Sequence, residues 1–306
     1  MLDLENDRST AKTSFVNLQD NTVLNLYESS NGNIWALLNK GIDCIETSSP
    51  VSMIFENAAT YDALIFKDKF YLATNQGVYV ANLRQGKQHL SRLDFKIIHG
   101  LEAQAWSLWE YNDEVVVAHD RGVFIIDGDK FYHVTGTNGI WKVIPVKGHE
   151  NRYLACAYSG LYLLERESNG KMVLKHKVEG FDTSSRDIME SDEPGVFWIC
   201  HGYKGVYRIK LDENYTRTIS LEHYTDKNGL PSLYNVNVFR WKNEVVFTTT
   251  SGVFTFDAKD SRFVQHNALT DMLGEDILVR KIMEDTDRTW FIHDDELGYF
   301  SHDNPE

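Results

Sequence analysis

The stretch GLPSLYNVNVFRWKNEVVFTTTSGVFTFD, residues 229–257, decides the fold of this chain. It opens with a Gly-Leu-Pro-Ser turn, continues through two runs rich in apolar residues, and passes a Ser-Gly turn into a third run. Short runs with alternating apolar residues indicate β-strands, and a glycine between two such runs indicates a tight turn. Similar segments recur along the whole chain, so the period of the repeat is the first property to establish.

Seven turn glycines mark the repeat, and each lies between two apolar strands. They recur about every 43 residues, with one further apolar run before each pair of strands and another after it. Four strands in a period of this length are typical of one blade of a β-propeller. The glycines are Gly41, Gly77, Gly122, Gly160, Gly205, Gly252 and Gly298.

We therefore predict an all-β fold, a seven-bladed β-propeller with four-stranded antiparallel blades. One such sheet is apolar on both faces, so it is stable only between neighbouring sheets, and closure of the ring would cover the last two faces. The propeller is expected as a single domain over residues 14–302, after a polar N-terminal arm at residues 1–13.

Two positions in the second strand of each predicted blade support this alignment. The first is large or branched in every repeat, and the position two residues later is mostly small. Both lie on one face of the strand, so adjacent sheets would interdigitate there. Cys156 and Cys200 occupy the small position on neighbouring blades, and sheets packed about 10 Å apart are too distant for a disulfide. We expect both cysteines to be buried and unreactive.

The next position holds a histidine in three repeats, His119, His201 and His293, and a threonine in two, Thr74 and Thr249. The histidines belong to non-adjacent blades, whereas one metal ion would need all three nitrogens within about 2.1 Å. We expect these side chains instead to supply a side-chain hydrogen bond within the turn before the glycine. The sequence predicts no metal site and no cofactor.

The net charge of −14 and a pI near 5.2 argue against binding to nucleic acid, which requires a basic surface. No apolar stretch of 18 residues predicts a membrane helix. The first ten residues, MLDLENDRST, are polar and acidic, which is unlike a signal peptide.

Two segments resemble the repeat of the two-component regulator propeller family. Residues 224–239, YTDKNGLPSLYNVNVF, place an aromatic residue, a spacer and Gly-Leu-Pro-Ser before an inner strand. Residues 15–55 place Asn21 before an inner strand, followed by Asn-Gly-Asn and Trp35. Residues 41–50, GIDCIETSSP, resemble the propeller of Bacteroidetes-type regulators that carry a triple-tyrosine domain, and the resemblance to the repeat runs over the whole chain. It departs from the repeat where Val116, Leu154 and Val246 replace the tryptophan, and Gly-Leu-Pro occurs once.

The resemblance implies an input domain of a sensor, located outside the cytoplasmic membrane in the periplasm and responding to glycan fragments. In such proteins a β-sandwich, a membrane helix and an output module follow, the last being a histidine kinase or a DNA-binding regulator. The expected partners are thus an oligosaccharide ligand and the downstream β-sandwich and signalling domains of the same protein. The resemblance leaves homodimer formation undecided, and no nucleic acid is expected as a partner of this chain.

One motif would fit an enzyme. SDEPGVFW, residues 191–198, matches the Asp-box pattern of sialidase propellers, in which the box is a turn device away from the catalytic residues. Sialidase chemistry also needs clustered arginines and a tyrosine nucleophile with an acid partner. We therefore predict a non-catalytic chain, with a polysaccharide hydrolase or lyase as the least favoured alternative.

The candidate ligand contacts lie just before or inside the innermost strands, which a propeller brings together at one end of its axis. Trp and Tyr there would stack on sugar faces, and Arg and Asn would hydrogen-bond hydroxyl or carboxylate groups. Several alternatives stay open: the tryptophans as core residues, the arginines as partners of acids, and a protein–protein interaction propeller without a small ligand. The candidates are Asn21, Tyr61, Trp106, Trp141, Arg186, Asn235 and Arg280.

Overall fold

The structure, a computed structural model, describes residues 2–3, 12–13, 18–46, 53–83, 93–294 and 296–302. Within these residues the chain forms two compact units, residues 1–56 with 87–93 and residues 57–86 with 94–306. Both units are built from antiparallel strands, and the described helices are the 3₁₀ turn η2 (Asp226–Asn228) and α1 (Asn267–Leu273). No helix in the described part of the chain is long and apolar enough to span a membrane.

The first unit contains one sheet of the repeat, a three-stranded antiparallel sheet in the order β3 (Val23–Glu28), β4 (Ile34–Leu38) and β5 (Ile42–Ile45). A short antiparallel pair, β1 (Leu2–Asp3) with β2 (Lys12–Thr13), lies within the predicted N-terminal arm. The predicted boundary between arm and propeller stays a prediction.

The second unit contains six sheets, each an antiparallel meander in chain order. Five of them have four strands, and the last has three among the described residues. The strands are β6 (Thr60–Phe66), β7 (Lys69–Thr74), β8 (Gly77–Asn82), β9 (Lys96–Glu102); β10 (Ala105–Tyr111), β11 (Glu114–His119), β12 (Gly122–Asp127), β13 (Lys130–Thr135); β14 (Ile140–Val146), β15 (His149–Ala157), β16 (Gly160–Arg166), β17 (Met172–Lys177); β18 (Asp187–Glu190), β19 (Val196–His201), β20 (Gly205–Leu211), β21 (Thr218–Tyr224); β22 (Asn237–Trp241), β23 (Glu244–Thr249), β24 (Gly252–Asp257), β25 (Arg262–Gln265); and β26 (Val279–Glu284), β27 (Arg288–His293), β28 (Glu296–Ser301).

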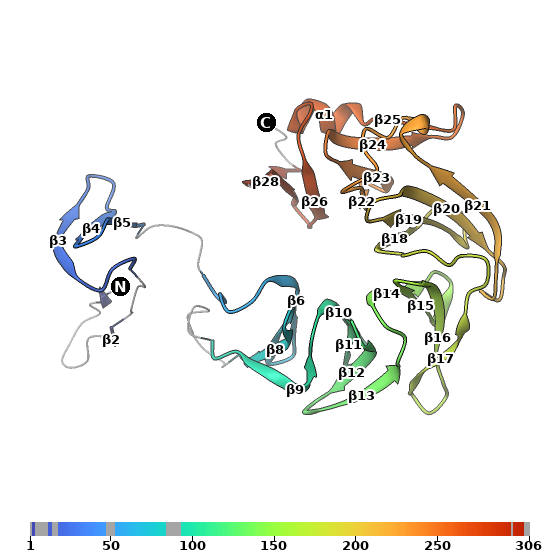
Figure 1. The fold of residues 1–306 in the computed structure, drawn as a ribbon, viewed down its shortest axis with the longest axis horizontal. Helices are drawn as coiled ribbons and strands as arrows, with labels where there is room; N and C mark the ends of the chain where they lie inside the picture. Colours follow the sequence, from blue (N-terminus) through green and yellow to red (C-terminus); the bar gives the residue numbers. More distant parts are fainter. Residues whose placement is uncertain are drawn as a thin grey trace. The chain divides into compact units, whose positions relative to one another are not determined.

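The predicted fold class, an all-β seven-bladed β-propeller, is confirmed by seven repeated antiparallel sheets of the expected topology. The prediction of four strands per blade holds for five sheets, and the first and seventh have three described strands. Within the second unit the sheets follow one another in chain order, with their first strands on the inner side and their last strands on the outer side (Figure 1). Ring closure involves both units and stays a prediction.

The core of the second unit lies between consecutive sheets, in five apolar clusters that each join two neighbouring blades. The second strand of a blade supplies both of its faces to this packing: Tyr153 and Ala155 pack toward the preceding blade, and Leu154 and Cys156 toward the next. All four are fully buried. Burial of a large apolar side chain stabilises the fold by about 1.5–3 kcal/mol, so each blade depends on its neighbours. The large and small positions therefore have the predicted role.

The two buried cysteines behave as predicted, since Cys156 and Cys200 are free thiols inside the core. Burial raises the pKa of both thiols, so they stay protonated and unreactive.

The predicted hydrogen bond in the turn before the glycine is confirmed in four repeats. Thr74 and Thr249 accept it on Oγ1, from backbone N–H groups at 3.1 and 3.0 Å. His119 and His201 accept it on Nδ1, at 3.0 and 3.1 Å from the backbone N–H groups two residues later. His293 instead lies near Asp294 and Glu296. An accepting Nδ1 must be unprotonated, so His119 and His201 are neutral in the folded state.

These histidines make the fold sensitive to acid. Burial and the nearby Arg121 lower the pKa of His119 below its ordinary 6.5, whereas the unfolded chain keeps the ordinary value. A His with a lowered folded-state pKa stabilises the fold above about pH 6.5, and the stabilisation is lost as the pH falls through the folded-state pKa. We predict that His119→Thr, which copies the residue at Thr74, loses less stability on acidification than the wild type. Urea denaturation at neutral and mildly acidic pH measures this difference, and an equal loss in both proteins would contradict it.

The turn glycine of the third blade is required by backbone conformation and by space. Gly122 has a φ of +127°, and an added Cβ would lie 1.7 Å from the Thr135 carbonyl oxygen. Gly128 has a φ of +62° with no atom within 4 Å of an added Cβ, so it is the matched control.

We predict that Gly128→Ala lowers the free energy of unfolding by about 1–2 kcal/mol, the cost of a left-handed L-residue. Gly122→Ala carries that cost and a backbone clash, so it should be markedly more destabilising. Denaturation midpoints of the two variants test this, and equal midpoints would show that the close approach to Thr135 is absent.

Candidate functional site

The first strand of nearly every sheet has an irregularity at one shared position. The pairing of β6 with β7 passes from Thr60 to Asp62, and Tyr61 is skipped. The same skip occurs at Trp106, Trp141 and Arg280. A β-bulge of this kind leaves one residue without a cross-strand partner and redirects its side chain. We call this the bulge position. In the two strands without a register shift, Arg186 and Val236 take the equivalent place, directly before the first paired residue. The position holds Leu24, Tyr61, Trp106, Trp141, Arg186, Val236 and Arg280.

Five of the seven candidate residues occupy this position: Tyr61, Trp106, Trp141, Arg186 and Arg280. The other two, Asn21 and Asn235, lie outside it. Asn235 is exposed in the loop before β22, one residue ahead of the buried Val236. Asn21 is exposed three residues ahead of Leu24 and belongs to the first unit.

Three of the candidates form a continuous row of aromatic rings. The Tyr61 and Trp106 ring centroids are 4.8 Å apart with planes at 22°, and the Trp106 and Trp141 centroids are 4.4 Å apart at 47°. The row ends at Tyr158, whose ring centroid lies 4.7 Å from that of Trp141. We call these four residues the aromatic ladder. It spans the second, third and fourth blades, and each aromatic pair adds about 0.5–1.5 kcal/mol beyond burial.

Tyr158 was not expected as a site residue from the sequence. It follows the last residue of β15, in the hairpin tip before Gly160, and is 40 % exposed. Its ring packs on the backbone of the preceding loop, because an added Cβ at Gly139 would lie 2.2 Å from the ring. One sequence feature could have identified Tyr158: it is a tyrosine in the hairpin tip of the blade whose inner strand carries a tryptophan.

The two tyrosines are the parts of the ladder most open to a ligand. Trp106 and Trp141 are half-buried and contact two rings each, whereas Tyr61 and Tyr158 contact one ring each and are both 40 % exposed. The tryptophans are therefore the more enclosed rings of the ladder.

Polar groups lie along the ladder. The Gln104 side-chain amide donates to the Tyr61 hydroxyl at 3.3 Å, and the Trp141 indole N–H donates to Ser184 Oγ at 3.0 Å. Burial, together with the nearby carboxylate of Asp120, raises the pKa of Tyr158, so its hydroxyl keeps its proton at neutral pH. The ladder thus combines ring surface with neutral donors and acceptors.

Arg186 and Asn237 form a second group at the corresponding place on the fifth and sixth blades. Arg186 Nη2 donates to Asn237 Oδ1. The Asn237 amide nitrogen donates to Thr248 Oγ1 and to the Asn235 carbonyl oxygen, both at 3.4 Å. These two bonds turn the Asn237 oxygen toward the guanidinium. Asn235 therefore contributes its backbone, and the neighbouring Asn237 contributes the side chain.

The position directly after the bulge is polar in every repeat and was not predicted as part of the site. Two of its carboxylates connect the first strands of successive blades. Asp62 Oδ2 accepts from the Leu108 N–H at 2.9 Å, and Asp187 Oδ2 accepts from the Val238 N–H at 3.1 Å. The position is held by Asn25, Asp62, Ser107, Lys142, Asp187, Asn237 and Lys281.

Lys142 and Asp187 form an ion pair between the fourth and fifth blades, with Nζ and Oδ1 3.1 Å apart. The Asp187 carboxylate raises the pKa of Lys142, and the lysine stays charged. Arg280, the remaining candidate, is exposed and donates from Nε to the Asp294 carbonyl at 2.9 Å.

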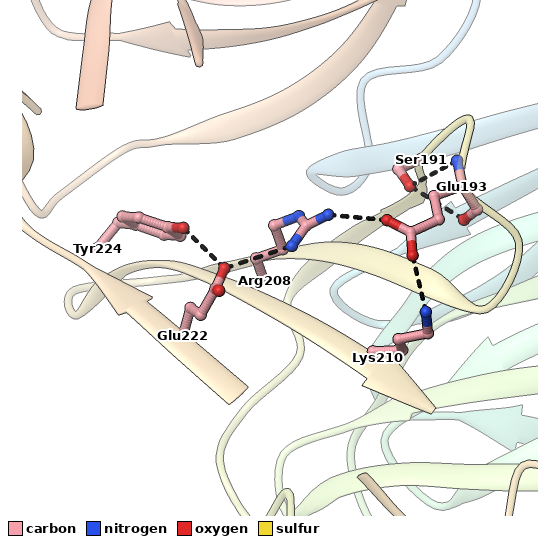
Figure 2. Close-up of polar contacts among 6 residues, drawn as sticks. All are labelled: Ser191, Glu193, Arg208, Lys210, Glu222 and Tyr224. Atoms are coloured by element: carbon pink, nitrogen blue, oxygen red, sulfur yellow. Dashed lines mark hydrogen bonds and ion pairs between the residues drawn. The ribbon is translucent and has the colours of Figure 1, made fainter. Parts of the chain in front are cut away.

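The Asp-box-like segment is a structural turn, as predicted. Ser191 Oγ accepts from the Glu193 N–H and donates to the Glu193 carbonyl, both at 3.1 Å. Figure 2 shows the Glu193 carboxylate held between Lys210 and Arg208, at 2.8 and 3.1 Å, with Arg208 also reaching Glu222. Lys210 and Arg208 lower the pKa of Glu193, so this acid is ionised and cannot serve as a proton donor near neutral pH. Over the described residues, no group of three His, Cys, Asp or Glu side chains is arranged to hold a metal ion.

Comparison with known proteins finds similarity in structure alone, since no family model and no curated protein matches the chain. The extracellular domain of BT4673 from B. thetaiotaomicron, a proposed hybrid two-component system, matches 99 % of this chain at 13 % identity and a TM-score of 0.59. The extracellular domain of BT3049 from the same organism, also a proposed hybrid two-component system, matches 81 % at 14 % identity and 0.56. The computationally designed protein Ika8 matches 91 % at 13 % identity and 0.52.

This chain spans 44 % of the BT4673 domain and 34 % of the BT3049 domain, and 83 % of Ika8. At these identities the likeness shows a shared fold. Because proteins of the same fold include both extracellular sensor-system domains and a designed protein, function must be argued from the site.

The ladder geometry has a spectroscopic consequence. Indoles as close as those of Trp106 and Trp141 should couple electronically and give an exciton couplet in the far-ultraviolet circular dichroism spectrum. We predict that Trp141→Phe abolishes the couplet and that Trp241→Phe, which removes an indole packed against His266, preserves it. A couplet that survives Trp141→Phe would show that the two tryptophans are not neighbours.

Proposed function

We propose that this chain is the ligand-sensing input domain of a periplasmic two-component-type or transcriptional regulator, and that it binds an oligosaccharide at the aromatic ladder. The observation that carries the proposal is the row of four rings that the bulge position and one hairpin tip assemble across three blades. The fold shared with extracellular domains of proposed two-component systems supports the sensory role.

The chemistry of the ladder suits a sugar. The C–H face of a pyranose packs on an aromatic ring, and Tyr61 and Tyr158 keep the largest exposed ring surface for this contact. Sugar hydroxyls need neutral donors and acceptors beside the ring, which the groups around Gln104 and Ser184 supply. A non-catalytic role is part of the proposal, since the acids of the box-like turn are held by cations.

A ligand on the ladder would contact several blades at once. Binding would then favour the arrangement in which these blades and the following domain pack best, and so shift a signalling equilibrium by differential affinity. The partners in this scheme are the downstream β-sandwich and signalling domains of the same protein, with a homodimer as one form of the output.

One observation favours a protein partner as the second candidate. Tyr158, Tyr203 and Tyr234 lie at the same end of the fourth, fifth and sixth blades and are 40 %, 59 % and 62 % exposed. Tyrosine is enriched at protein–protein interfaces, so this end would also suit a protein surface.

Calorimetric titration with a panel of neutral and acidic oligosaccharides tests the proposal. We predict binding of at least one sugar, and a loss of about ten-fold or more in affinity in both Tyr61→Ala and Tyr158→Ala, since each removes about 1.4 kcal/mol or more of stacking. Tyr299→Ala removes a half-exposed tyrosine of β28 and is the control. Absence of heat with every sugar would reject the proposal in favour of the protein partner.

A further inference from the structure

We propose that the sugar ligand is acidic, and that its carboxylate or sulfate group binds Arg186 while a neighbouring sugar unit packs on the aromatic ladder. This inference deepens the proposed function and rests on it. It assigns the charge class of the ligand, which the ladder alone leaves undefined.

Arg186 is a half-buried cation without an acidic partner. Its side chain donates to the neutral Asn237 side chain, and in the part of the chain that the structure describes no carboxylate lies within ion-pair distance of the guanidinium. A guanidinium carries five N–H donors in a planar fork, so a single amide oxygen satisfies a small part of it. Burying a charged group without a counter-ion is unfavourable, and an anionic ligand would relieve that cost.

The adjacent acid is not available to Arg186 because other groups hold it. Asp187 Oδ1 lies 3.1 Å from Lys142 Nζ and accepts the Ile188 N–H at 3.1 Å. Asp187 Oδ2 accepts the Val238 N–H at 3.1 Å. Lys142 and Asp187 therefore neutralise each other, and the positive charge of Arg186 has no counter-ion among the described residues.

A buried histidine on the next strand responds to this charge. His201 is 3 % exposed, and after burial the cations Lys204 and Arg186 lower its pKa further. The fifth blade thus has a positive end on a chain whose net charge is −14.

The positive end lies next to the ladder. Arg186 occupies the bulge position on the blade after that of Trp141. It follows by two residues Ser184, whose hydroxyl accepts the Trp141 indole N–H at 3.0 Å. One short segment, 184–186, therefore borders the last tryptophan of the ladder and carries the unpaired cation. Tyr158, the exposed end of the ladder, packs on the same tryptophan.

A carboxylate and a sulfate share the chemistry that Arg186 recognises, because each presents two oxygens to the guanidinium fork. Both occur on sugars, as uronic acids and as sulfate esters. The two sources are separated by the choice of probe.

The test compares matched sugars by calorimetry. Trigalacturonate and its methyl ester have the same ring stereochemistry and differ in charge, and galactotriose with and without 6-sulfation supplies the second pair. We expect at least one charged sugar to bind about ten-fold or more tightly than its neutral partner at low salt, with the difference reduced at high salt.

The variants assign the difference to one residue. Arg186→Gln should remove the difference, so that the variant binds the charged sugar and the neutral sugar with equal affinity. Arg262→Gln, in an exposed residue of β25, should change neither. Neutral and charged sugars binding equally well would overturn the inference and leave the proposed function standing, whereas no binding of any sugar would reject both.

A readout in the wild-type protein makes the test independent of the variant's folding. Because Arg186 helps to lower the pKa of His201, a bound anion should raise that pKa toward its ordinary value, as followed by NMR titration of the ring. The methyl ester should leave it unchanged. Binding of trigalacturonate or the sulfated sugar without any change at His201 would place the anion elsewhere and refute the inference.

Discussion

The structure depends on one constraint: the middle strands of each blade are buried on both faces, and only a neighbouring blade can cover them. The alternation of Tyr153, Leu154, Ala155 and Cys156 between two different apolar clusters shows this within one strand. A single sheet of this kind has no stable isolated form, and a stack of them buries a continuous core. The repetition of the sequence is thus a physical requirement, and it leaves the sheet faces unavailable for binding.

Under the proposed function the ligand contacts lie at the ends of the strands, at the bulge position. In five of the described first strands one extra residue loses its cross-strand partner, which redirects its side chain. The residue after it pairs again with the second strand. At Asp62 and Asp187 the side chain of this residue accepts a backbone N–H of the next blade. A site built this way has a rigid frame, because the groups that orient it also join the blades.

Much of the fold could be predicted from the sequence, because it follows from local chemistry. Turn glycines such as Gly122 and the large and small positions have direct structural causes, and the turn role of His119 and His201 follows from the same logic. The number of described strands in the first and last sheets and the division into two compact units could not be predicted, since both depend on contacts between segments far apart in the chain.

The candidate site stays a prediction, and the sequence placed only some of its residues at the bulge position. The inner-strand rule selected Tyr61, Trp106, Trp141, Arg186 and Arg280, which all occupy the bulge position. It chose Asn235 where the chain places Val236, because the residue at which an inner strand begins has no local sequence signal. Whether neighbouring rings stack depends on the spacing and twist between blades, so the packing of the tryptophans against each other and against Tyr158 was not foreseeable. The role of Asn237 depends on the orientation of its side-chain amide. That orientation is set by hydrogen bonds to the Asn235 carbonyl oxygen and to Thr248 Oγ1, which the sequence alone does not show.

The claim that the bulge position forms the binding site is tested most directly by a crystal structure of the protein in complex with an oligosaccharide. The account predicts sugar density against the exposed rings of Tyr61 or Tyr158, with hydroxyl groups near Gln104 or Ser184. Density confined to another surface, with the ladder left uncovered, would contradict it.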